Sequence, residues 1–224
     1  MEEQQATFKR LWDRFSRQVS NNDGFVDYPD QTGLRSQYVT TVVRLPQDIA
    51  QKCFSSLALE LPNDYHYPMS DMHLTLLNLD ALLANHALDN EQKMVLVEKI
   101  EKSISTLPPL EFKVSGLGLF PTTIYAQIYD VNEALEIYRK AIKDAVNELT
   151  GGESDGQALV KGIAFANLVR FKQKPGPKLV GIINNLREVE FGSFTAARFE
   201  LVTTDKLLSQ ENTRIHKPIP LPIK

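Results

Sequence analysis

The sequence predicts an α+β protein made of two pseudo-symmetric lobes, each an antiparallel sheet flanked by helices. Short runs rich in β-branched and aromatic residues alternate along the chain with segments in which apolar residues recur at helical spacing. Near the middle, two such runs flank the turn Pro121-Thr122-Thr123 and predict a hairpin. The order β-α-β-α-β-β-α-β-α-β repeats the same elements on either side of this turn, which indicates an internal duplication of element order.

The individual elements are placed by local signals. Pro46 ends the first strand, Asp89 with Gln92 resembles a capping box, and Gly151-Gly152 closes the third helix of the main domain. The prolines at the end of the chain predict an extended tail over residues 218–222. The expected strands cover residues 38–45, 72–79, 110–119, 124–129, 163–170 and 194–203, and the expected helices cover residues 48–59, 89–107, 132–149 and 178–186.

Residues 1–36 are expected to form an N-terminal helical arm, and residues 37–224 are expected to form the main domain. The arm is predicted to contain a helix from about Glu3 to Val19, because Phe8, Leu11, Trp12, Phe15 and Val19 recur at helical spacing. The arm either packs on the main domain or contacts a partner protein. We favour packing, because a Trp and two Phe on one stripe are usually buried.

The composition limits the class of protein. The chain has 224 residues, of which 42% are hydrophobic and 24% charged, and this is ordinary for a globular protein with a sizeable core. Its one cysteine, Cys53, excludes an internal disulfide and a cysteine-rich metal site. No apolar run reaches the length of a membrane span, and the acidic start of the chain lacks the character of a signal peptide. We therefore expect a cytoplasmic protein without membrane contact.

Two polar residues lie on one face of the strand predicted over residues 72–79. Strand side chains alternate between faces, so His73 and Thr75 point the same way from an otherwise apolar strand. An imidazole can exchange a proton near neutral pH, and a hydroxyl two residues on can bond the same ligand. By itself, a His-x-Thr pair is more typical of an edge strand whose polar face meets water.

A basic segment supports an anionic ligand. Residues 156–187 contain no Asp or Glu and six basic residues, namely Lys161, Arg170, Lys172, Lys174, Lys178 and Arg187. A positive electrostatic potential of this kind would favour phosphate binding, although a solvated lysine loop explains the segment equally well. The net charge of −3 argues against binding of a long nucleic acid. A small phosphorylated molecule, a nucleotide or an RNA end fits better.

Five segments together resemble a known family. His73-Leu74-Thr75-Leu76 and Phe165-Ala166-Asn167-Leu168-Val169-Arg170 lie on matching strands of the two halves. With residues 65–71, 112–121 and 199–207, they resemble the two-histidine phosphoesterases, the LigT-like or 2′-5′ RNA ligase family, over roughly residues 37–222. The resemblance implies two lobes whose His-x-Thr pairs face each other across a groove. It also implies cleavage of 2′,3′-cyclic phosphates or 2′-5′ linkages without a metal or cofactor.

In the mechanism that the resemblance implies, one histidine takes a proton from water or a hydroxyl and the other gives a proton to the leaving oxygen. The family pattern at the second site is His-x-Thr-x-x-Arg, and here it is Phe165-x-Asn167-x-x-Arg170. A phenylalanine cannot move a proton, and one general acid or base contributes roughly 10²–10⁴ in rate. Asn167 can still bond a phosphoryl oxygen, and Arg170 can supply charge.

The resemblance thus makes His73 and Thr75 the candidate catalytic residues. The candidates for substrate or phosphate binding are Phe165, Asn167, Arg170, Tyr67 and Tyr125. Phe165 either stacks on a base or belongs to the core, and His66, His86 and His216 are expected at the surface. The first function hypothesis is a phosphodiesterase or cyclic phosphodiesterase in which His73 is the surviving acid or base. The alternatives are a non-catalytic phosphate-binding module and a scaffold.

Overall fold

The computed structural model describes residues 1–21, 23, 26, 28, 37–57, 60–80, 82–83, 88–151 and 162–223. Its strands are β1 (Tyr38–Arg44), β2 (Tyr65–His66), β3 (His73–Asn78), β4 (Glu111–Leu119), β5 (Thr123–Asp130), β6 (Ala164–Arg170), β7 (Glu190–Thr195), β8 (Arg198–Thr204) and β9 (Arg214–Pro220). Its helices are α1 (Glu2–Ser20), α3 (Gln47–Ser55), α4 (Asn90–Ile104), α5 (Leu135–Thr150) and α6 (Pro177–Asn184), with 3₁₀ turns η1 (Met69–Asp71) and η2 (Gln210–Asn212). None of the helices in these ranges combines the length and apolar character needed to cross a bilayer.

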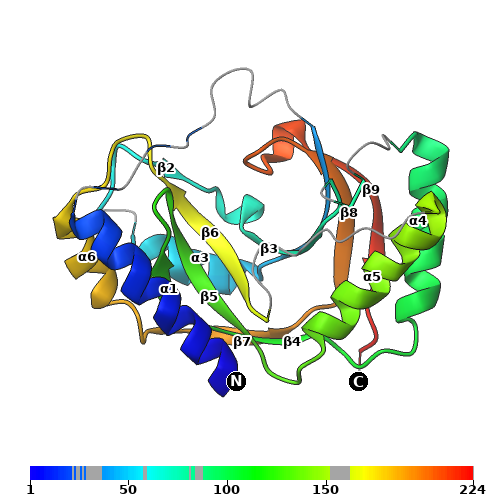
Figure 1. Cartoon of the computed structure of the whole chain (residues 1–224), viewed down its shortest axis with the longest axis horizontal. Helices are drawn as coiled ribbons and strands as arrows, with labels where there is room; N and C mark the ends of the chain where they lie inside the picture. Colours follow the sequence, from blue (N-terminus) through cyan, green and yellow to red (C-terminus); the bar gives the residue numbers. More distant parts are fainter. Residues whose placement is uncertain are drawn as a thin grey trace.

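The strands form one antiparallel sheet in the order β7-β4-β5-β6-β3-β1-β8-β9, with β2 beside β6 (Figure 1). The sheet has two halves of four strands: β6-β5-β4-β7, here called the Phe165 half, and β3-β1-β8-β9, here called the His73 half. The halves meet at β3 and β6, where the one registered pair is Leu74 with Ala166. The predicted α+β fold of two lobes is therefore confirmed, as two halves of one sheet joined at a narrow seam. The predicted duplication on either side of the central turn is wrong, because each half contains strands from before and after that turn.

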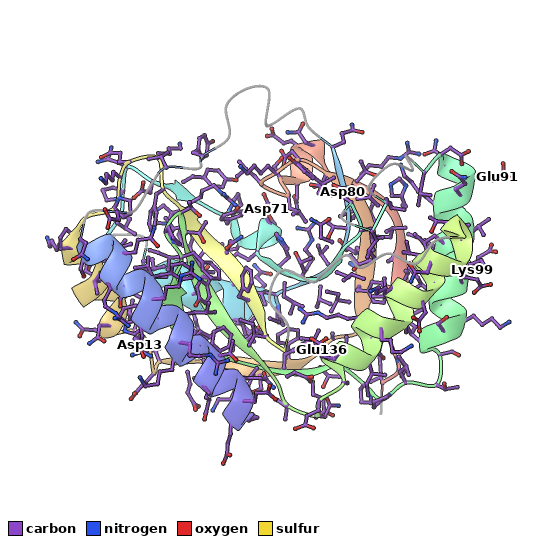
Figure 2. The ribbon with its side chains drawn as sticks, in the orientation of Figure 1. Asp13, Asp71, Asp80, Glu91, Lys99 and Glu136 are labelled. Carbon is purple, nitrogen blue, oxygen red and sulfur yellow. The ribbon has the colours of Figure 1, made fainter. Side chains whose placement is uncertain are left out.

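Helices cover each half separately. In the His73 half, α4 packs against α5 and β9, and α5 also contacts β3 (Figure 1). Figure 2 labels Lys99 of α4 and Glu136 near the start of α5. The predicted capping box of α4 is present, because Asp89 accepts from the backbone N–H of Gln92 and Gln92 accepts from that of Asp89. Gly151 ends α5 in the left-handed conformation, at φ 68°, as its position predicted.

The N-terminal helix packs on the Phe165 half, which confirms the favoured alternative for the arm. Phe8, Trp12 and Val19 are buried, and α1 contacts β4 and α6 (Figure 1). The Gln4 side chain donates to the carbonyl of Asp130 at 3.0 Å and accepts from its N–H at 2.9 Å, as a neighbouring strand would. Most of the loop predicted after this helix, including residues 29–36, lies outside the described residues.

Three predicted segments differ from the structure. The strand expected over residues 194–203 is two strands, β7 and β8, which belong to different halves of the sheet. The expected extended tail continues β9, which pairs with β8 and tolerates Pro218 and Pro220 because it is an edge strand. The aromatic loop before the His-x-Thr pair contains the short strand β2, whose Tyr65 pairs with Arg170.

Candidate functional site

Strand pairing at the seam brings the two motifs together. Because β3 and β6 are antiparallel with Leu74 opposite Ala166, the next residues outward place His73 opposite Asn167 and Thr75 opposite Phe165. Side chains alternate along both strands, so these four project from the same face of the sheet. The resemblance implied that the two motifs face each other. The pairing of Leu74 with Ala166 brings them side by side on one face of the sheet.

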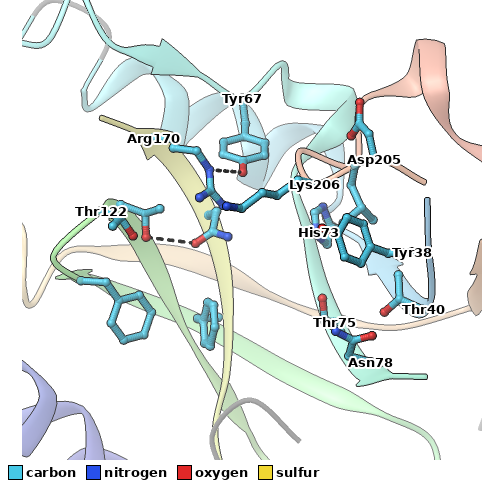
Figure 3. Close-up of a pocket in the computed structure, with 15 residues that line it drawn as sticks. Tyr38, Thr40, Tyr67, His73, Thr75, Asn78, Thr122, Arg170, Asp205 and Lys206 are labelled. Atoms are coloured by element: carbon cyan, nitrogen blue, oxygen red, sulfur yellow. Dashed lines mark hydrogen bonds between the residues drawn. The ribbon is translucent and has the colours of Figure 1, made fainter. Parts of the chain in front are cut away.

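A cavity of about 510 Å³ opens on this face, between the two halves (Figure 3). The predicted site residues that line it are Tyr67, His73, Thr75, Phe165, Asn167 and Arg170. The other lining residues come from β1, the end of β3, the β4–β5 turn and the segment after β8: Tyr38, Thr40, Asn78, Phe120, Thr122, Thr123, Asp205, Lys206 and Leu208. The cavity therefore collects side chains from both halves.

His73 is held as a neutral proton acceptor. Its side chain is buried, and Nδ1 lies 2.6 Å from the carbonyl oxygen of Asp71. A carbonyl oxygen only accepts, so Nδ1 carries the hydrogen and Nε2 holds the lone pair. The pKa of His73 is lowered to about 4, mainly by burial and to a lesser degree by Arg44, while the bond to the Asp71 carbonyl acts in the opposite direction. At neutral pH the ring is thus unprotonated, and the lone pair of Nε2 can accept a hydrogen bond.

The loop before β3 places the carbonyl that orients His73. Residues Met69–Asp71 form the turn η1, in which the N–H of Asp71 donates to the carbonyl of Pro68 at 2.8 Å. Met72 then returns to an extended conformation and leads into β3. The sharp turn puts the Asp71 carbonyl beside the first side chain of the strand, which is His73.

Arg170 is a buried cation at the opposite wall. Arg170 is the last residue of β6 and its side chain is buried. Its Nε donates to the Tyr67 hydroxyl at 3.2 Å (Figure 3). Tyr67 is also buried, and its backbone N–H donates to the carbonyl of Leu168. Tyr67 therefore lines the cavity and also positions the guanidinium, which is a second role that the sequence did not suggest.

Asn167 and Phe165 supply a polar group and an aromatic ring to the β6 side of the cavity. The Asn167 amide oxygen accepts from the Thr123 hydroxyl at 3.3 Å, so the amide nitrogen, a donor, remains the group suited to a ligand oxygen. The ring of Phe165 lines the cavity and also meets Phe120 edge-on, at a centroid distance of 5.1 Å. Phe165 is thus a wall of the cavity and part of an aromatic cluster, and its stacking on a base stays a prediction.

The predicted role of Tyr125 in ligand binding is not supported, because Tyr125 does not line the cavity. Tyr125 pairs with Asn167 and so shares its face of the sheet. However, its ring is fully buried, stacked on Phe120 at 4.3 Å and covered by Phe8 of α1. Within the described part of the chain its buried hydroxyl has no hydrogen-bond partner, and burial raises the pKa of Tyr125. Packing of α1 therefore removes Tyr125 from the site.

We expect Tyr125→Phe to raise the free energy of unfolding by about 1 kcal/mol, because it removes a buried hydroxyl that bonds to nothing. Urea unfolding at neutral pH measures the effect. The matched control is Tyr67→Phe, which removes the acceptor of Arg170 and should be destabilising. A loss of ligand affinity in Tyr125→Phe would instead return Tyr125 to the site.

The other described histidines lie outside the cavity. His66 Nε2 is 2.7 Å from the carbonyl of Leu61, and its ring lies against Phe54. His216 Nε2 is 2.7 Å from the Thr203 hydroxyl, and burial lowers the pKa of His216. His86 falls outside the described residues. Among the histidines that the structure describes, only His73 lines the cavity.

The basic segment does not form a continuous track at the cavity. Of its six basic residues, Arg170 lines the cavity, whereas Lys172 lies over the Tyr28 ring and Arg187 over the Trp12 ring. Lys174 and Lys178 line a separate hollow beside α6, and Lys161 is not described. Within the described ranges, no group of three His, Cys, Asp or Glu side chains could hold a metal ion.

Asp205 and Lys206 are charged cavity residues that the sequence reasoning missed. The position of Lys206 shows why. It follows β8, and it lines the cavity together with Asp205 and Leu208. In the sequence these residues stand out only as part of a closing strand. Asp205, Lys206 and Leu208 reach the site because β8 pairs with β1, and no local pattern in the sequence predicts that pairing.

Comparison with known proteins finds similarity at the level of structure. No protein-family model and no curated protein matches the sequence. The crystal structure of TT0787 of Thermus thermophilus matches with a TM-score of 0.62 at 17% identity, over 82% of this chain and 97% of that one. A crystal structure described as a phosphoesterase matches with a TM-score of 0.57 at 13% identity, over 84% and 99%. Escherichia coli LigT, complexed with NADP+, matches with a TM-score of 0.56 at 14% identity, over 84% and 98%. The chain therefore has the LigT-like fold.

Proposed function

We propose that this protein is a phosphodiesterase that binds a nucleotide or an RNA end in the seam cavity and uses His73 as its general base. The observation that carries the proposal is the arrangement of His73 and Arg170. A buried neutral imidazole and a buried guanidinium line one cavity from opposite halves of the sheet. This combination suits a reaction in which a proton is removed beside an anionic phosphoryl group.

The shape of the cavity and its lining support a nucleotide-sized ligand. Its volume of about 510 Å³ lies within the range of small-molecule sites. Phe165 and Phe120 offer aromatic faces to a base, and Thr75, Asn167 and Arg170 offer donors to phosphoryl oxygens. Structures of E. coli LigT, which has the same fold, contain ATP, 3′-AMP, NADP+ or phosphate.

The proposed reaction on a 2′,3′-cyclic phosphate begins with a water molecule beside His73. Nε2 takes a proton from the water as its oxygen attacks phosphorus. Arg170, Asn167 and Thr75 hold the non-bridging oxygens, and their bonds strengthen as charge develops there. The bond from phosphorus to one ribose oxygen then breaks, and that oxygen must receive a proton.

The second candidate function is a phosphate-binding module without turnover. It is favoured by the residue opposite Thr75, where Phe165 occupies the place of the second histidine in the family pattern. A ring without titratable groups cannot protonate the leaving oxygen. The cavity would then keep its donors and its guanidinium for binding alone.

A turnover assay with nucleoside 2′,3′-cyclic phosphates and 2′-5′-linked dinucleotides tests the proposal. Turnover by the wild-type protein, lost in His73→Ala, is the expected result. Binding of 3′-AMP without turnover of either substrate would favour the module instead. Failure to bind any phosphorylated ligand would leave a scaffold.

We expect Arg170→Met to weaken the binding of 3′-AMP by about tenfold to a hundredfold, because hydrogen bonds to charged groups contribute about 1.5–3 kcal/mol. Methionine keeps much of the apolar stem, and isothermal titration calorimetry measures the dissociation constant. Arg214→Met is the matched control, since Arg214 is exposed on the edge strand β9. Equal losses in the two variants would point to a general effect of net charge rather than a phosphate contact.

A further inference from the structure

Lys206 reaches the cavity from the His73 half of the sheet. It is the second residue after β8, and Figure 3 shows its side chain extending into the cavity in the direction of Arg170 and Tyr67. Two cationic side chains, on different halves of the sheet, thus enter the same space.

Asp205 is the acidic side chain among the described lining residues, and its hydrogen bonds are to residues 207–212. Asp205 is buried, and its carboxylate accepts from the N–H groups of Leu207 and Ser209 at 2.8 and 3.1 Å. It also accepts from the Ser209 hydroxyl at 2.6 Å and the Asn212 amide at 2.9 Å. These four bonds brace the segment after β8 and fix the point from which Lys206 extends.

Backbone strain marks the same segment. Leu208 has φ 52°, a conformation that is uncommon for a residue with a side chain, and it also lines the cavity. Residues held in such conformations persist where the surrounding bonds determine them, and they cluster at functional sites. Here the Asp205 carboxylate supplies those bonds.

The proposed reaction lacks a donor for the leaving oxygen, and the cavity offers few. Phe165 has no proton to give. Tyr67 lines the cavity, but only 1% of its surface is exposed and its hydroxyl is bonded to Arg170. A lysine ammonium has three N–H donors on a flexible stem and is more acidic than a ribose hydroxyl, so transfer of its proton to a leaving alkoxide is favourable.

We propose that Lys206 replaces the absent acid histidine by donating a proton from Nζ to the leaving ribose oxygen. This role rests on the proposed phosphodiesterase function. The water oxygen forms a bond to phosphorus, and the bond from phosphorus to the ribose oxygen breaks. The water proton goes to His73 Nε2, and the Nζ proton goes to the ribose oxygen. Solvent then carries the proton from the imidazolium back to the amine.

The proposal changes the expected pH profile. A site with two histidines loses activity when its acid histidine deprotonates near neutral pH. A site whose acid is not a histidine lacks this loss, so kcat should not fall as the pH rises through neutrality. A bell-shaped profile centred near neutral pH would contradict a lysine donor.

The test compares Lys206→Arg and Lys206→Met with the wild-type protein. Arginine keeps the positive charge but does not give up a proton. Lys206→Arg should therefore lower kcat on a nucleoside 2′,3′-cyclic phosphate by about 10²-fold or more while leaving the affinity for 3′-AMP nearly unchanged. Lys206→Met should lower kcat and also weaken the binding of 3′-AMP. Lys178→Met, at an exposed lysine outside the cavity, is the control.

A substrate with a good leaving group separates proton donation from a structural role. A nucleoside 3′-(p-nitrophenyl phosphate) releases p-nitrophenolate, which needs no proton, so Lys206→Arg should retain nearly full kcat on it. An equal loss on both substrates would overturn the donor role. Wild-type kcat in Lys206→Arg on the cyclic phosphate would overturn it as well, with the phosphodiesterase function intact. A wild-type protein without any turnover would overturn both.

Discussion

Replacing His73 by glutamine is expected to lower the turnover of a nucleoside 2′,3′-cyclic phosphate by about 10²–10⁴-fold. Glutamine can donate to the Asp71 carbonyl as the imidazole does, but it cannot take a proton from water. The affinity for 3′-AMP should change little, because Arg170 and Asn167 remain in place. Initial rates at saturating substrate, together with calorimetric titration of 3′-AMP, measure the two quantities separately.

His216→Gln is the matched control for this variant. His216 lies outside the cavity and bonds the Thr203 hydroxyl on the neighbouring strand β8. It should keep the wild-type rate. If His73→Gln also keeps the wild-type rate, His73 is not the base, and the remaining polar residues of the cavity must be tested in turn.

The stability of the folded chain is expected to fall by about 3 kcal/mol between pH 6.5 and pH 4 because of His73 alone. In the unfolded chain a histidine has a pKa near 6.5, whereas burial lowers the pKa of His73 in the folded chain to about 4. Above pH 6.5 both states hold a neutral ring, and the full stability is present. Below it the unfolded state binds a proton that the folded state does not bind until about pH 4. Each pKa unit corresponds to about 1.4 kcal/mol.

Urea unfolding at pH 7, 5.5 and 4.5 measures this effect when wild type is compared with His73→Gln. Other groups also titrate in this range, since burial raises the pKa of Asp80 and Asp130 and lowers that of His216. Both proteins share these groups, so the difference between them isolates His73. Parallel curves for the two proteins would show that the ring of His73 takes up a proton in the folded state as readily as in the unfolded one.

The elements with local signals could be predicted from the sequence, and the His73 side of the site is the clearest example. Alternation placed His73 and Thr75 on one face of β3, and the capping residues Asp89 and Gln92 fixed the start of α4. The boundary between β7 and β8 had no such signal, because Ala196-Ala197 contains neither Gly nor Pro.

The places where the site differs from the sequence analysis have a tertiary origin. Tyr125 lies on the face of the sheet that alternation predicts, but Phe8, from the far end of the chain, covers it. Lys206 approaches His73 only because β8 pairs with β1, and β1 in turn pairs with β3. Long-range strand pairing and helix docking leave little trace in a local pattern, so neither could be foreseen.

The interleaving of the two halves fixes the order in which a growing chain can assemble the site. All four strands of the Phe165 half are synthesised between β3 and β8, so that half can pair internally while the His73 half holds only β1 and β3. Joining β8 to β1, as in the pair Glu200 with Val42, closes a loop that contains almost all of the other half, and closure of such a loop is slow. During biosynthesis, Lys206 can therefore reach the cavity only after β8 has left the ribosome and paired with β1.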